Sequence, residues 1–267
     1  MNSHRGSNVC PFPAKSLKKG SCILAILLAF FFVSCSGKKE VKPAEEFDPE
    51  KSLARATELI DKKEYEEARK VLLEVKNRDL TKKYAPLAHL KIADSYAREE
   101  EPELAVQEYR KFIDMYPDNK FASYAQYQVA MSYFNQIEGP EKGYGAAAKA
   151  LYEFDRLKQL YPRNPYKEII ELRIEKCKNI IADYEFLVGE FYFKKGSYNA
   201  AVGRFESLLA KFPDYHDEAL VLFHIALSYK RLADKDKAQE YITRLAEKYP
   251  HDKYLKEAKK EFPRIIQ

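Results

Sequence analysis

The sequence predicts an all-α protein made of repeated antiparallel helix pairs, and three observations lead to this prediction. Glycine is scarce (9) and tryptophan absent, while tyrosine (20) and phenylalanine (16) are abundant, which suits helices whose gaps are filled by aromatic rings. Residues 187–213 predict a helix, a turn at 194–197 and a second helix. The second helix stops before a proline, which lacks an N–H and clashes with the preceding turn. The same landmark residues return at fixed spacings elsewhere in the chain.

The clearest repeat is the segment 187–213, whose landmarks are Gly189, Tyr192, Ala201, Phe205 and Pro213. Tyr192 lies nine residues before Ala201, and Ala201 lies twelve before Pro213. The small residues Gly189 and Ala201 let two helices approach closely, and the aromatic rings fill the space beside them. The pattern resembles the tetratricopeptide (TPR) repeat of about 34 residues, a helix pair that buries its apolar face only by stacking on its neighbours. This resemblance implies a right-handed TPR superhelix of five helix pairs.

Four further repeats are predicted from the same pattern. Their signature residues are Ala56, Leu59, Tyr65, Ala68 and Leu72 in the first; Ala93, Tyr96, Ala105, Tyr109, Phe112 and Pro117 in the second; Ala130, Tyr133, Ala150, Phe154, Leu157 and Pro162 in the third; and Ala226, Tyr229, Ala238, Ile242, Leu245 and Pro250 in the fifth. The first is atypical, as terminal repeats often are. The third carries eight extra residues that contain three glycines and predict a loop. Apolar residues along one face of 252–267 predict a capping helix.

One long helix is predicted to join repeats 3 and 4. An apolar stripe with alternating steps of four and three runs through Ile170, Ile174, Cys177, Ile181, Tyr184, Val188 and Phe191, the spacing of one helix face. Residues 166–195 contain no proline, and at 1.5 Å per residue they would extend about 45 Å. The predicted divisions are therefore an N-terminal lobe of repeats 1–3 (49–163) and a C-terminal lobe (164–267) with the long helix, repeats 4–5 and the capping helix.

Residues 1–34 predict a lipoprotein signal peptide. Lysines at 15, 18 and 19 precede a twelve-residue apolar run at 22–33, too short for a membrane span of about 20 residues but typical of a secretory signal. The residues Phe32-Val33-Ser34-Cys35 resemble a bacterial lipobox, which implies cleavage before Cys35 and a covalent lipid on it. The residue after Cys35 is Ser36 and not the aspartate associated with retention in the inner membrane, so sorting of the lipoprotein to the outer membrane is favoured. The alternative is an ordinary cleaved signal with an incidental cysteine. Residues 35–48 predict a flexible tether.

Charge and motifs exclude several classes of function. Four of the 46 basic residues precede residue 35, which leaves 42 against 41 acidic residues and gives no case for nucleic-acid binding. No histidine pair has metal-ligand spacing, and no phosphate loop, dinucleotide fingerprint or nucleophile motif occurs. We therefore expect no enzyme, no metal site and no cofactor other than the lipid on Cys35. Cys177, on the apolar stripe, is expected to be a buried core residue.

A lipobox, a short tether and five TPR repeats together resemble the BamD family, the lipoprotein subunit of the outer-membrane β-barrel assembly machine. The resemblance is closest in residues 184–215, which carry an acidic-aromatic helix, a turn glycine, an A-A-V-x-R run and a final F-P. It implies that Arg204, with Lys195 beside it, pairs with an acidic residue in the POTRA domains of a BamA-like barrel insertase. It also implies binding of unfolded outer-membrane protein precursors and a lipid-anchored location on the outer membrane, facing the periplasm.

Two features qualify this resemblance. The third-repeat insert is shorter than in the family's best-known members, and Gly143-Tyr144-Gly145 stands where the family often has an acidic residue. TPR solenoids bind partners along a groove lined by the first helix of each repeat, and Tyr127, outside the signature positions, is a candidate for that groove. The alternative function is a general envelope TPR adaptor, for example one that coordinates peptidoglycan synthesis or cell division.

Overall fold

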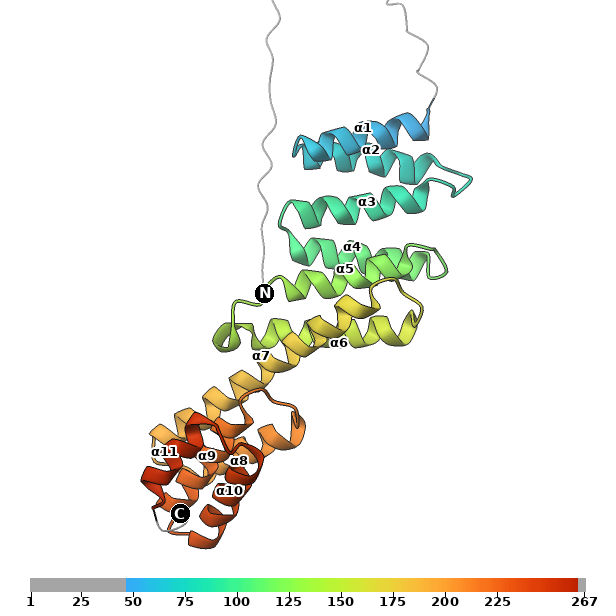
Figure 1. The fold of residues 1–267 in the computed structure, drawn as a ribbon. Coiled ribbons are helices and arrows are strands. Elements are labelled where there is room, and N and C mark those ends of the chain that lie inside the picture. The colour runs from blue at the N-terminus through green and yellow to red at the C-terminus, as the bar shows by residue number, and fades with distance from the viewer. Residues whose placement is uncertain (1–46, 264–267) are drawn as a thin grey trace, which may run out of the picture. The chain divides into compact units, whose positions relative to one another are not determined.

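The computed structural model describes residues 47–263, which contain eleven α-helices and no strand (Figure 1). The helices are α1 (Pro49–Asp61), α2 (Tyr65–Arg78), α3 (Ala85–Arg98), α4 (Pro102–Met115), α5 (Ala122–Phe134), α6 (Pro140–Leu160), α7 (Lys167–Lys194), α8 (Tyr198–Lys211), α9 (Glu218–Arg231), α10 (Lys235–Lys248) and α11 (Lys253–Glu261). Each helix from α1 to α10 contacts the next, and α11 contacts α9 and α10. The predicted all-α TPR fold of five helix pairs is confirmed. The signal peptide, Cys35 and most of the tether lie outside the described residues.

Aspartate side chains start three of the helices. Asp48 Oδ1 accepts hydrogen bonds from the backbone N–H groups of Glu50 and Lys51, at 2.9 and 3.1 Å. Asp234 and Asp252 accept equivalent bonds at the starts of α10 and α11. Such caps satisfy N–H groups that have no partner inside the helix. The sequence thus contains its own start signals at both ends of the described chain.

Four of the five helix pairs share one turn. Lys63, Glu100, Gly196 and Ala233 each have φ between 61 and 76°, the left-handed region. In each turn the next N–H bonds back to a carbonyl five residues earlier, as Ser197 N does to Tyr192 O at 2.9 Å. This is the bond of a Schellman motif, which closes a helix C-terminus and reverses the chain.

The core consists of four hydrophobic clusters along the stack. They lie among α1–α3, α3–α5, α5–α7 and α7–α11. Ala201, which was predicted to allow close helix approach, has no exposed surface, and the other signature alanines are at most 2% exposed: Ala56, Ala68, Ala93, Ala105, Ala130, Ala150, Ala226 and Ala238. Each helix pair therefore buries its inner face against its neighbours.

The loop predicted in the third repeat is wrong. Most of the insert is helical, because α6 begins at Pro140 and runs for 21 residues. Gly139, with φ of 131°, turns the chain, and proline is favoured in the first helical turn, where its missing N–H has no role. Gly143 is buried in α6, where an added Cβ would lie 3.0 Å from Ile137 Cγ2. Of the glycines that suggested a loop, Gly139 turns the chain before α6 and Gly143 allows close packing of Ile137 on the start of this longer helix.

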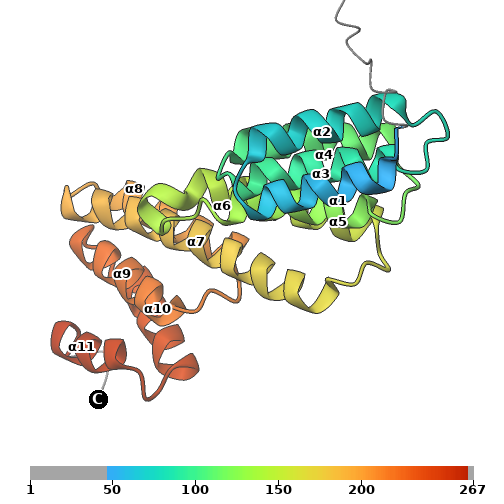
Figure 2. The ribbon, with the colours of Figure 1, turned by 90° about the horizontal axis from the view of Figure 1, so that it is seen from above.

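The predicted long helix is confirmed as α7, which has 28 residues. Its first half packs on α6 and its second half on α8 (Figures 1 and 2). Cys177 is fully buried in the first half, as expected, and burial raises the pKa of its thiol to about 11. A thiol with so high a pKa is protonated at neutral pH and unreactive.

Candidate partner-binding sites

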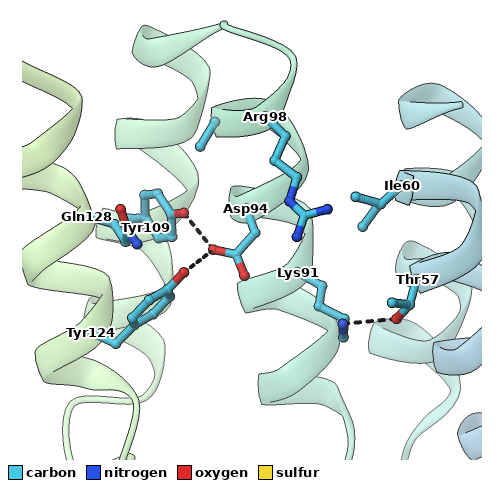
Figure 3. A pocket seen from close by; sticks show the side chains of 9 residues that line it. Thr57, Ile60, Lys91, Asp94, Arg98, Tyr109, Tyr124 and Gln128 are labelled. Carbon is cyan, nitrogen blue, oxygen red and sulfur yellow. Dashed lines mark hydrogen bonds between the residues drawn. The ribbon is translucent and has the colours of Figure 1, made fainter. Parts of the chain in front are cut away.

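A polar pocket is lined mainly by the first helices of the first three pairs, α1, α3 and α5, and also by Tyr109 of α4 (Figure 3). It has a volume of about 300 Å³. Its walls come from α1, α3, α4 and α5, and the lining residues are Thr57, Ile60, Lys91, Asp94, Ala97, Arg98, Tyr109, Tyr124 and Gln128. The pocket therefore occupies the position of the peptide groove that the TPR pattern predicts.

Asp94 is the centre of this pocket. Its Oδ1 accepts hydrogen bonds from the hydroxyl groups of Tyr109, at 2.6 Å, and Tyr124, at 3.0 Å. Burial raises the pKa of the Asp94 carboxyl, and the two tyrosine hydrogen bonds oppose this rise. Burial and the Asp94 charge also raise the pKa of Tyr109, and that of Tyr124 to about 12, so both hydroxyl groups keep their protons. The two tyrosines thus hold the carboxylate in one orientation.

Two cationic side chains lie on the same face of α3 as Asp94. Lys91 Nζ donates to Thr57 Oγ1 at 3.0 Å, and Arg98 pairs with Asp61 at 3.0 Å (Figure 3 shows the lysine bond). Neither contact uses all the N–H donors of its side chain. The pocket therefore offers N–H donors from Lys91 and Arg98, a carboxylate acceptor from Asp94 and the side-chain amide of Gln128. Such a set can hydrogen-bond both the N–H and the C=O groups of an extended polypeptide.

The second candidate region is the α7–α8 hairpin, which contains Arg204 and Lys195. Arg204 is in α8, and its side chain is 49% exposed. Its Nη1 lies 3.3 Å from Oε2 of Glu185 in α7, whose side chain is 15% exposed. This single contact leaves most of the guanidinium N–H donors free. Arg204 is therefore fixed beside α7 and can still form a bidentate pair with a carboxylate on a partner.

Lys195 is the residue that follows α7, and its Nζ lies 5.7 Å from the centre of the Phe191 ring. Lys194, its neighbour, pairs with Glu190 at 2.9 Å. Lys195 and Arg204 therefore belong to the same hairpin. Their role in binding a partner remains a prediction.

Tyr127 occupies a different environment. It belongs to α5, is half-buried, and stacks on Tyr166 with 4.2 Å between ring centres. Its hydroxyl accepts a hydrogen bond from Arg173 Nη1. Tyr127 thus connects α5 to the start of α7, and its predicted groove role would use only the remaining exposed part of the side chain.

Sequence reasoning missed Asp94 as a site residue. It had assigned Tyr109 to packing through the TPR signature, whereas the structure shows that the Tyr109 hydroxyl also bonds Asp94. The position of Asp94 could have indicated its role, because it directly follows Ile92 and Ala93, which are both buried. A carboxylate on that flank of a helix needs hydrogen-bond partners.

Comparisons with known proteins identify the family. The family profile described as "YfiO: Outer membrane lipoprotein" matches residues 46–242. The chain belongs to this family. Relatives align with most of the chain: the outer membrane protein assembly factor BamD of Caulobacter vibrioides is 26% identical, and the alignment covers 88% of this chain and 78% of the relative. BamD of Rickettsia prowazekii is 27% identical, and the alignment covers 73% of this chain and 78% of the relative. BamD of Neisseria meningitidis serogroup B is 23% identical, and the alignment covers 88% of this chain and 93% of the relative.

Comparison with solved structures finds TPR proteins, such as the TPR2AB domain of yeast Sti1, at 14% identity and a TM-score of 0.44 over 78% of this chain and 80% of that one. Between residues 47 and 263, no helix combines the length and apolar character needed to cross a membrane. Within the same residues, no group of three or more His, Cys, Asp or Glu side chains is arranged to hold a metal ion.

Proposed function

We propose that this protein is a lipid-anchored, non-catalytic scaffold that acts in the assembly and insertion of β-barrel proteins into the outer membrane. Membership of the YfiO family supports this role, as do the relatives that are named outer membrane protein assembly factors. The observation that carries the proposal is the state of Arg204. Its guanidinium is half-exposed and held by one 3.3 Å contact to Glu185, so it is placed and free to bind an acidic partner.

The partner of Arg204 in this proposal is a barrel insertase of the BamA type, bound through an acidic residue of its periplasmic POTRA domains. Arginine suits such a contact because its planar fork matches a carboxylate in geometry as well as charge. Lys195, on the same hairpin, adds a second positive charge that attracts an acidic surface.

The pocket around Asp94 is the proposed site for unfolded outer-membrane protein precursors. An unfolded chain exposes backbone N–H and C=O groups, and the pocket provides acceptors and donors for both. Binding through the backbone tolerates many sequences, which a scaffold for different barrel precursors requires. The pocket volume of about 300 Å³ admits a short stretch of such a chain and leaves the rest in solvent.

The anchor of the scaffold is the lipid proposed on Cys35, which lies outside the described residues. A single acyl chain holds a protein weakly and several hold it stably, which agrees with the multiple acylation of a bacterial lipoprotein. The fourteen residues from Cys35 to Asp48 span about 20 Å as a flexible coil. The repeats would thus remain close to the periplasmic surface of the membrane.

Depletion of the protein from growing cells tests this function. We expect folded β-barrel proteins to disappear from the outer membrane first, measured by the heat-modifiable mobility of barrels in gels. The competing adaptor function predicts a different order, in which peptidoglycan synthesis or division fails while barrel folding continues. That second result would reject the proposal.

A further inference from the structure

The loop between α2 and α3, residues 79–84, presents a leucine to solvent. Leu80 is 93% exposed, compared with 68% for Leu172, the next most exposed large apolar side chain among residues 47–263. In the four other repeats the equivalent position, twelve residues after the signature alanine, is a proline. Leu80 therefore has no packing role in the described part of the chain. Apolar residues that are exposed singly are ordinary, so the surroundings of Leu80 decide what it can bind.

Asp79 fixes the shape of this loop. Its Oδ1 accepts hydrogen bonds from the backbone N–H and the hydroxyl group of Thr81, at 3.2 and 2.6 Å. Its Oδ2 accepts one from the N–H of Ala85, at 2.8 Å, and one from the N–H of Tyr84. The carboxylate of the loop is thus used within it, and the segment that carries Leu80 is held in one conformation.

Basic side chains surround Leu80. Residues 76–83 contain one acid and four basic residues, which leaves a net charge of +3; the basic residues are Lys76, Arg78, Lys82 and Lys83. Arg78 pairs with Glu74, and Lys83 lies 3.9 Å from Glu50, whereas the other two lysines form no ion pair among residues 47–263. An apolar side chain among basic residues is typical of segments that bind the surface of anionic membranes.

The described chain begins beside this loop. The Arg78 guanidinium lies over the ring of Phe47, at 4.1 Å from its centre. Figures 1 and 2 show that α1 starts at the edge of the stack where the loops after α2, α4 and α6 lie. Twelve peptide links separate Cys35 from Phe47, and they span about 20 Å as a flexible coil. A lipid on Cys35 would therefore hold this edge, and not the opposite one, close to the membrane.

The next two helix pairs also have an apolar residue at this edge. Ten residues after the signature alanine, at the ends of α4 and α6, stand Met115 and Leu160, which are 56% and 51% exposed. In the two pairs of the C-terminal lobe the same position is a lysine, Lys211 or Lys248. Exposed apolar residues at this position are thus confined to the lobe that the tether joins.

We infer that the α2–α3 loop contacts the periplasmic leaflet of the outer membrane, with Leu80 inserted among the lipid headgroups and Lys76 and Lys82 beside the phosphate groups of anionic phospholipids. This inference rests on the lipid anchor of the proposed function and adds an orientation to it. The edge formed by the loops after α2, α4 and α6 faces the membrane, and the turns within the helix pairs face the periplasm. A weak contact suffices, because the tether keeps the loop at a high local concentration of lipid.

A fluorescent label at residue 80 tests this contact in the full-length lipoprotein. Leu80→Cys is labelled with the polarity-sensitive dye NBD, since Cys177 is buried, and the protein is reconstituted into vesicles of phosphatidylethanolamine and phosphatidylglycerol. Leu104→Cys is the control, because Leu104 is 39% exposed in the first turn of α4, at the other end of the helices. Spin-labelled lipids should quench the label at residue 80 about threefold more than the label at residue 104. Equal quenching at the two positions would overturn the inference.

Two lysines provide a matched test of the charge. Lys82 and Lys63 are both exposed, with φ of 57 and 63°, but Lys63 lies in the turn between α1 and α2. Lys82→Glu should lower the quenching at residue 80 about twofold, because it adds a negative charge beside anionic lipid, while Lys63→Glu should leave it unchanged. Equal effects of the two substitutions would contradict a contact through this loop.

The remaining outcomes separate a lipid from a protein partner and the loop from the anchor. A benzophenone amino acid at residue 80 that cross-links chiefly to a protein in native outer membranes would overturn the inference. If the lipoprotein floats with vesicles while the label at residue 80 stays in water, the loop contact is wrong and the anchor stands. If mass spectrometry finds no lipid on Cys35, the anchor fails and the inference fails with it.

Discussion

Gly189 of α7 lies directly against the ring of Phe205 of α8: a Cβ added to the glycine would be 2.5 Å from Phe205 Cε1. No carbon atoms pack at that separation, so the contact exists only because residue 189 has no side chain. Phe205 is fully buried and has little room to move. This contact therefore sets the distance between α7, which Lys195 follows, and α8, which contains Arg204.

Gly189→Ala should therefore destabilise the protein. Glycine to alanine in a helix normally stabilises by about 1 kcal/mol, whereas overpacking a tight contact costs about 1–3 kcal/mol. We expect a net loss of stability in urea-unfolding curves. Gly203 of α8 is the control, since a Cβ there meets nothing within 4 Å, so Gly203→Ala should raise stability. A stabilising effect at both positions would show that α7 and α8 are not in close contact.

The turn shared by the helix pairs predicts opposite changes in stability for two substitutions at equivalent positions. Gly196 and Ala233 occupy the same left-handed position, with φ of 76 and 61°, which costs residues other than glycine about 1 kcal/mol. Gly196→Ala should lower the free energy of unfolding by about 1 kcal/mol, and Ala233→Gly should raise it by a few tenths to about 1 kcal/mol. Differential scanning calorimetry of both variants measures this, and equal signs would contradict the turn assignment.

The repeats could be predicted from sequence because their signals are local. Small residues such as Gly189 and Ala201 recur at fixed offsets, as does a proline after the second helix of four of the five repeats, and the stripe from Ile170 to Phe191 has the period of one helix. These features depend on neighbouring residues in the chain, and the structure confirms them.

Other features depend on contacts between distant segments and could not be predicted in the same way. Glycines 143 and 145 indicated a loop, but Gly143 is required by the Ile137 side chain that packs on the start of α6. Asp94 becomes a site residue only because Tyr109 and Tyr124 converge on it from two other helices.

A buried histidine makes the stability depend on pH. His224 lies among the rings of Phe186, Phe193 and Phe205, and this burial lowers its pKa below the usual 6.5. As the pH falls through 6.5, the unfolded chain binds a proton that the folded protein does not, so the free energy of unfolding decreases until the lower folded pKa is reached.

His224→Phe should remove this part of the pH dependence. Between pH 7.5 and 5.5 we expect the unaltered protein to lose more stability than the variant, because its unfolded chain binds a proton on His224 more readily than the folded protein does. Urea-unfolding curves at both pH values measure the difference. An identical loss in both proteins would mean that His224 binds its proton equally well when folded.

Cys35 is predicted to carry the lipid. Cys35→Ala should give a protein that remains an unprocessed precursor or becomes soluble, because the thiol that receives the lipid is absent. Flotation of membranes on a density gradient, followed by detection of the protein, measures this. Retention of the variant on outer membranes that lack its protein partners would contradict the lipoprotein prediction.

The most direct test of the whole account is the charge reversal Arg204→Glu, measured by co-purification of the barrel insertase with the full-length lipoprotein and by a thermal melt. Loss of a desolvated arginine–carboxylate pair costs about 2–5 kcal/mol of binding, while an exposed helix residue contributes little to folding. Arg55→Glu is the control, because Arg55 is an exposed helical arginine in α1. The account predicts that Arg204→Glu releases the insertase with an unchanged melt and that Arg55→Glu retains it. An Arg204→Glu protein that still co-purifies with the insertase would contradict it.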